Sequence, residues 1–173
     1  MSHQDEPEPE QQVAQDVVFV ESGMFLLAEP GTADVSFTPD NGLVFTNMPG
    51  VTVVVTGIAT GDVNVTVEVR RDAPRHVELD TWDEVVDQSL TAPTGNVRVR
   101  GLADDPPDLP LLTPYGPGTY RVRVHARGRD TAPDGATFEP VEDYRIIIWS
   151  APQVTDTVHK QTDAVGSSWR RST

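Results

Sequence analysis

The chain has 173 residues and no cysteine, and its 27 acidic residues against 13 lysines and arginines give a formal net charge of −14. The missing cysteine excludes disulfides, thiolate metal sites and cysteine nucleophiles. A strongly acidic surface repels nucleic acid and anionic membranes, so we expect no direct binding to either. The length predicts a single folded domain.

Two polar segments flank the region that we expect to fold. Residues 1–16 are rich in Glu, Gln and Pro and contain no aromatic residue, so they predict a disordered acidic tail. They also lack the apolar stretch of a signal peptide, and we therefore expect a cytoplasmic protein. Residues 151–173 are similarly polar and predict a flexible C-terminal tail. The folded domain is expected to span residues 17–150.

Alternation of apolar and polar residues dominates the region between these tails. Its clearest example places Val63, Val65, Val67 and Val69 on one side of a single strand. Such alternation, with turn signals between the runs, predicts about nine strands and almost no helix. The expected fold is all-β, an antiparallel β-sandwich of the jelly-roll or Ig type, with a closed barrel as the alternative. The expected strands cover residues 17–22, 24–29, 42–47, 51–60, 61–71, 84–92, 96–103, 119–128 and 143–150.

Basic side chains line the outer face of the strand expected at 119–128. If the strand at 96–103 lies beside it, their side chains form a patch that binds a small anion through planar guanidinium groups. If carboxylates lie between them, the same row is an ordinary set of cross-strand ion pairs. The candidate residues of this anion site are Arg98, Arg100, Arg121, Arg123, His125 and Arg127.

Acidic side chains concentrate in two segments, around 78–87 and 104–108. Neither segment has the spacing of an EF-hand, and the chain has no nucleophile elbow and no phosphate-binding loop. We therefore expect no catalytic residue, no metal and no cofactor. The acidic segments instead predict a contact surface for a basic protein partner. Its candidate residues are Asp80, Asp83, Glu84, Asp87, Asp104, Asp105 and Asp108.

Four motifs follow one another along the chain in a characteristic order: WDEVVDQSL, GNVRVRG, GPGTYRVRVHARGRD and EDYRIIIWSAP. In this order the chain resembles a group of uncharacterised bacterial β-sandwich proteins that are distantly similar to the competence nuclease inhibitor. The resemblance implies a small all-β protein without a cofactor, and the inhibitor implies binding to a nuclease through an acidic surface. The residues that carry the resemblance are Trp82, Gly118, Tyr120, Arg127, Gly128, Tyr144 and Trp149.

Three functional hypotheses follow from the sequence. The first is a non-enzymatic protein-binding module, of the inhibitor or immunity type, that uses the acidic surface. The second is a module that binds a small anion or a sugar on the arginine-rich strand face. The third, ranked last, is an enzyme of unrecognised type.

Overall fold

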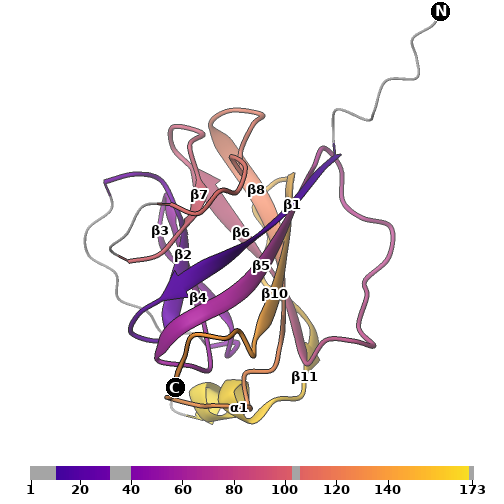
Figure 1. Cartoon of the computed structure of the whole chain (residues 1–173). Coiled ribbons are helices and arrows are strands. Elements are labelled where there is room, and N and C mark those ends of the chain that lie inside the picture. The colour runs from indigo at the N-terminus through magenta and orange to yellow at the C-terminus, as the bar shows by residue number, and fades with distance from the viewer. Residues whose placement is uncertain (1–10, 32–39, 103–105, 172–173) are drawn as a thin grey trace, which may run out of the picture.

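The computed structural model describes residues 11–31, 40–102 and 106–171, which form two β-sheets and one short helix (Figure 1). The larger sheet has the strand order β1-β5-β10-β8-β6-β11, and β9 pairs with β5. Its strands are β1 (Gln11–Val20), β5 (Thr60–Arg70), β6 (Glu84–Ala92), β8 (Gly118–Arg127), β9 (Ala136–Thr137), β10 (Asp143–Ser150) and β11 (Thr157–Gln161).

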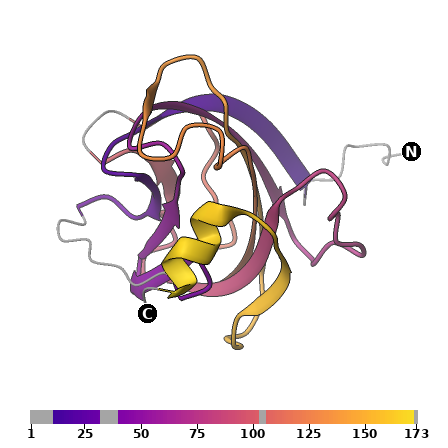
Figure 2. The same cartoon turned by 90° about the horizontal axis from the view of Figure 1, so that it is seen from below.

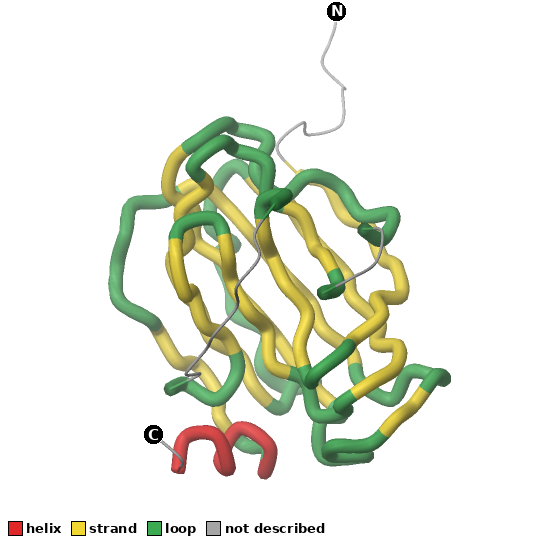
Figure 3. Tube along the Cα trace, turned by 90° about the vertical axis from the view of Figure 1, so that its left-hand side faces the viewer, coloured by secondary structure: helices red, strands yellow, loops and turns green. Residues whose placement is uncertain are grey.

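The smaller sheet has the order β3-β4-β2-β7. Its strands are β2 (Met24–Ala28), β3 (Val44–Met48), β4 (Val51–Val55) and β7 (Arg98–Arg100). The helix, α1 (Ala164–Arg171), lies across one end of the molecule (Figures 2 and 3). None of the described helical segments is long and apolar enough to cross a bilayer.

The all-β class expected from the sequence is confirmed, but the expected strand count and direction are not. All nine expected segments overlap a strand, and the described residues form eleven because β9 and β11 add to them. The larger sheet is mixed rather than antiparallel, since β5 runs parallel to both β10 and β9. It is also an open sheet with β1 and β11 at its edges, so the closed-barrel alternative is wrong. Alternation identifies a strand but does not identify its neighbours, which explains the wrong strand direction and the wrong barrel alternative.

The main hydrophobic core is built from the inward faces of both sheets. Val63, Val65, Val67 and Val69 of β5 are all buried in it, as the alternation predicted. Phe25 of the smaller sheet meets Tyr144 of β10 edge to face, with ring centroids 5.3 Å apart. The two sheets therefore share one core, and most of its residues are aromatic or β-branched.

The N-terminal boundary expected at residue 17 is wrong, because β1 begins at Gln11. The strand pairs with β5 over its whole length, from Gln11 opposite Arg70 to Val20 opposite Gly61. Backbone hydrogen bonding along β5 holds this polar stretch in the sheet, although few of its side chains reach the core. Residues 1–10 of the expected tail lie outside the described residues.

The prediction of a flexible C-terminal tail at 151–173 is also wrong for the part of this segment that the structure describes. Residues 157–161 form β11 on the edge of β6, and residues 164–171 form α1. Trp169 of α1 packs against a second apolar cluster on β2 and β4. Polar composition suggested disorder, but this segment is held by strand pairing, one aromatic contact and buried ion pairs, which composition does not show.

Gly61 provides a test of the packing between β5 and β9. Its φ of +136° is unfavourable for residues with a side chain, and a Cβ atom there would collide with the carbonyl oxygen of Thr137. We expect Gly61→Ala to lower the free energy of unfolding by about 2 kcal/mol. Urea unfolding followed by circular dichroism measures this. Gly31 also has a positive φ, of +86°, but open space around it, so Gly31→Ala should lower the free energy of unfolding clearly less.

Candidate functional site

The arginine row on β8 lies on the outer face of the larger sheet, but its first two arginines are covered rather than exposed. Arg121 and Arg123 are 5% and 6% exposed. Arg121 donates to the carbonyl oxygens of Val154 and Thr155, at 3.0 and 2.8 Å. The C-terminal segment that the sequence suggested was flexible therefore covers this part of the row.

Carboxylates lie between the members of the row. Both oxygens of Asp87 accept hydrogen bonds from Arg123, at 2.7 and 3.0 Å, and this guanidinium also lies over the ring of Trp149. Burial alone would raise the pKa of Asp87, but hydrogen bonds from Arg123 and His159 bring it below its ordinary value. Arg127 pairs with Asp143 through a single hydrogen bond, from its Nε to one carboxylate oxygen at 3.0 Å. Arg123 and Arg127 of the row therefore form ion pairs across neighbouring strands, whereas Arg121 bonds only to neutral groups.

The remaining two arginines of the expected anion site are elsewhere. Arg98 and Arg100 lie on β7, which belongs to the smaller sheet, whereas the row lies on the larger one. Their side chains donate to the carbonyl oxygens of Leu109 and Ala28. The structure thus does not bring the six expected residues together in one patch.

The expected acidic contact surface is divided as well. Glu84 and Asp87 are buried, on opposite faces of β6, and each faces an arginine of the protein itself. Asp83 accepts a hydrogen bond from the backbone of Gly128. Asp80 and Asp108 are exposed, while Asp104 and Asp105 lie outside the described residues. A run of acidic residues across a strand start cannot lie on one surface, because successive side chains point to opposite faces.

A buried ionic cluster beneath α1 was missed by the sequence reasoning. Arg129 is fully buried and donates to both oxygens of Asp163, at 2.8 and 2.9 Å. Glu84 lies 3.8 Å from Arg129 and accepts from Arg170 at 3.1 Å. Burial raises the pKa of Glu84 to about 7, and the charge of Asp163 adds to this effect. No sequence pattern connected Arg129 with a segment expected to be disordered.

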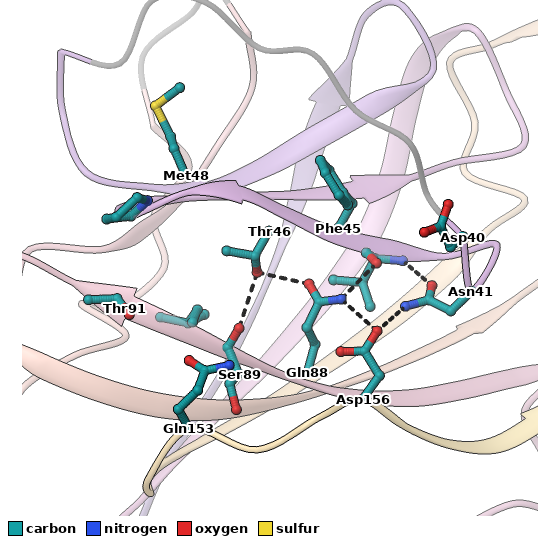
Figure 4. Close-up of a pocket in the computed structure, with 13 residues that line it drawn as sticks. Asp40, Asn41, Phe45, Thr46, Met48, Gln88, Ser89, Thr91, Gln153 and Asp156 are labelled. Carbon is teal, nitrogen blue, oxygen red and sulfur yellow. Dashed lines mark hydrogen bonds between the residues drawn. The ribbon is translucent and has the colours of Figure 1, made fainter. Parts of the chain in front are cut away.

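A groove opens between β3 and β6, where the two sheets separate (Figure 4). It has a volume of about 410 Å³, and segments 40–49, 88–91 and 153–156 contribute to its walls. Two exposed carboxylates, Asp40 and Asp156, lie at this groove, together with Met48, which is 41% exposed. None of the described residues that line it is basic.

Hydrogen bonds hold the polar wall of the groove in place. Figure 4 shows Asn41, Gln88 and Asp156 turned toward one another, and the Asp156 carboxylate accepts from both amides at 3.0 Å. Thr46 donates to the Gln88 amide oxygen at 2.8 Å. The side-chain oxygen of Asn41 also accepts from the backbone of Leu43 and Val44. The groove therefore presents fixed oxygen acceptors to a ligand.

The sequence had one partial indication of this groove. Asp40 and Asn41 stand in the turn that was expected before residue 42, and a turn of this kind commonly uses Asn to bond its own backbone. Gln88 and Asp156 carry no such signal, since they meet Asn41 only in the folded chain. Within the described ranges, no group of three or more His, Asp or Glu side chains is placed to hold a metal ion.

Comparison with known proteins supports the fold alone. No family model matches the chain, and no curated protein matches it. The solved structure of crocagin biosynthetic gene J is similar, with a TM-score of 0.51 and 15% sequence identity, and the match covers 82% of this chain and 99% of that one. At this identity the two proteins share an architecture, and fold similarity alone does not establish a shared function.

Proposed function

We propose that this protein is a non-enzymatic protein-binding module, of the inhibitor or immunity type, and that its partner is basic. The groove between β3 and β6 is the central part of the proposed contact surface. One observation carries the proposal. Two exposed carboxylates, Asp40 and Asp156, lie at the groove, and none of its described lining residues is basic.

The distribution of charge supports a basic partner. Arg121, Arg123 and Arg129 are buried, and Arg127 and Arg145 pair with carboxylates of the protein itself. Exposed carboxylates such as Asp72, Asp80 and Glu139 contribute to the protein's net charge of −14. Such a surface steers a basic partner toward the protein and accelerates association at low salt.

The groove has the chemistry to accept a lysine or arginine side chain from that partner. Asp156 offers a carboxylate that is already oriented by Asn41 and Gln88. Charge-assisted hydrogen bonds from a guanidinium or ammonium group to carboxylates are stronger than neutral ones. Met48 at the rim adds a flexible apolar contact of the kind found at protein interfaces.

We propose three further properties of the protein. The two sheets are proposed to form a β-sandwich, the protein is proposed to act in the cytoplasm, and its relation to the competence nuclease inhibitor remains a proposal that rests on sequence motifs. The second hypothesis, a small-anion module, needs arginines other than the row on β8, since Arg123 and Arg127 are in ion pairs and Arg121 is buried with its donors bonded to neutral groups.

A fluorescent oligoarginine peptide can test the contact surface. We expect it to bind the wild-type protein, and its affinity to fall about tenfold when salt is raised from about 50 to about 300 mM. The double variant Asp40→Asn/Asp156→Asn should weaken binding about fivefold at low salt, because it removes both carboxylates of the groove. Fluorescence anisotropy measures each dissociation constant.

A variant with the same change in net charge is the control. Asp72→Asn/Glu139→Gln removes two exposed carboxylates that do not line the groove. It should change the affinity by less than about twofold. Equal weakening by the two double variants would show that the peptide responds to overall charge, and the proposed surface would then be wrong.

A further inference from the structure

A second cavity, of about 370 Å³, lies on the outer face of the larger sheet, away from the groove. Its walls come from β5, β8, β10 and the segment at 74–78. Five of its lining side chains carry cationic or imidazole groups, which is unusual in so acidic a protein: Arg70, Arg75, His76, His125 and Arg145. Of these, the expected anion site included His125 alone.

His125 lines this cavity and has a ring nitrogen without a hydrogen-bond partner among the described residues. The residue is 1% exposed, and its Nδ1 lies 3.0 Å from the carbonyl oxygen of Arg145. Because a carbonyl oxygen only accepts, Nδ1 carries the proton, and Nε2 of the neutral ring keeps a free lone pair. Burial lowers the pKa of His125 to about 4, so the ring is neutral at physiological pH. Within the described part of the chain, Nε2 has no hydrogen-bond partner.

The arginines of the cavity keep donors for a ligand. Arg75 is exposed and forms no hydrogen bond or ion pair with any described residue. Arg145 is held between Glu68 and Glu78, at 2.7 and 2.9 Å, and each of these contacts uses one of its nitrogens. Three arginines against two glutamates leave a local excess of one positive charge.

We propose that this cavity binds a protonated phosphate group, either free or as a small phosphate monoester. The oxygens of the phosphate accept hydrogen bonds from Arg75 and from the remaining donors of Arg70 and Arg145. The P–OH group donates to Nε2 of His125. This inference does not depend on the proposed protein partner, because it concerns a different face of the molecule.

The two glutamates favour the protonated ligand. Glu68 and Glu78 repel an oxyanion in proportion to its charge, so a singly charged phosphate is preferred to a doubly charged one. A phosphate monoester has a second pKa of about 6, so near that pH about half of it still carries the proton. Sulfate has the same shape but no proton at this pH, and it cannot donate to His125.

The test compares phosphate with sulfate at about pH 6, by isothermal titration calorimetry on the whole chain. We expect inorganic phosphate to bind about tenfold more tightly than sulfate, as a hydrogen bond to an otherwise unpaired nitrogen predicts. Glycerol 3-phosphate in place of inorganic phosphate shows whether an ester fits. Tighter binding of the ester identifies a phosphorylated metabolite as the ligand class, and tighter binding of inorganic phosphate identifies the free ion; either result supports the proposal.

Two variants separate the parts of the site. Arg75→Ala should weaken phosphate and sulfate alike, by about tenfold. His125→Asn keeps a donor near the position of Nδ1 but lacks Nε2, so it should abolish the preference for phosphate over sulfate. Arg171→Ala, which removes an exposed arginine of α1, is the control and should change neither affinity.

Two results would overturn the proposal, and neither requires the buried His125 variant to fold. One is equal affinity of the wild-type protein for phosphate and sulfate. The other is phosphate binding that Arg75→Ala leaves unchanged.

Discussion

Replacement of Arg129 by methionine is expected to lower the free energy of unfolding by about 3–5 kcal/mol. Arg129 is fully buried, and its guanidinium donates to both oxygens of Asp163 and to the carbonyl oxygens of Gly42 and Val55. Methionine has a similar volume but leaves the Asp163 carboxylate buried without its partner. The lost stability is the free-energy penalty of an unpaired charge in the interior. This penalty is larger than the net stabilisation that the ion pair itself provides.

Urea unfolding at neutral pH measures this loss of stability. Two further variants show whether it comes from the unpaired buried charge. Arg127→Met breaks the ion pair with Asp143, whose side chains are 43% and 37% exposed, and should cost about 0–1 kcal/mol. Arg129→Met/Asp163→Asn removes the buried charge while Asn keeps the ability to cap α1, so it should regain part of the stability. If Arg129→Met were as stable as Arg127→Met, the role of Arg129 as the buried partner of Asp163 would be wrong.

The stability of the protein is expected to fall as pH rises from about 4.5 to about 7. Burial raises the pKa of Glu84 from 4.5 to about 7, so in this range the folded protein binds a proton that the unfolded chain has released. Stability contributed by the neutral carboxyl is complete below pH 4.5 and is lost as pH rises through 7. The loss from this group amounts to about 3 kcal/mol.

Glu84→Gln tests the assignment, because glutamine is neutral at every pH. The variant should be more stable than the wild type at about pH 8, and its unfolding free energy should vary less between about pH 5 and about pH 8. Some dependence remains, since burial also raises the pKa of Glu142. Glu139→Gln, an exposed position, should follow the wild type. Parallel curves for wild type and Glu84→Gln would show that Glu84 is not the titrating group.

These two effects depend on the C-terminal segment, which the sequence suggested was flexible. Asp163 and Arg170 come from that segment, whereas Arg129 and Glu84 come from a loop and from β6. Hydrophobic patterning predicts segments that bury apolar surface, and residues 151–173 have little of it. Here a polar segment is held by charges and by backbone pairing with β6, and neither leaves a periodic signal in the sequence.

The candidate sites show the same limitation. In the alternation of β8, Val122 and Val124 face the core and Arg121 and Arg123 face away, as the pattern predicts. The pattern could not show that the outward face is covered and paired. The groove and the phosphate cavity each combine residues from at least three separate segments, so no motif predicted either one.

The sequence by itself determined the all-β class, the approximate positions of nine of the eleven described strands and the inward side of β5 and β8, because a strand's side-chain period is local. Only the tertiary structure decided which strands are neighbours and in which direction they run. It also decided which of the many arginines and carboxylates meet. Those choices depend on contacts between residues far apart in the chain, such as Arg129 with Asp163 and Asn41 with Asp156. A charged residue in a sequence shows its charge, but its partner is selected by the fold.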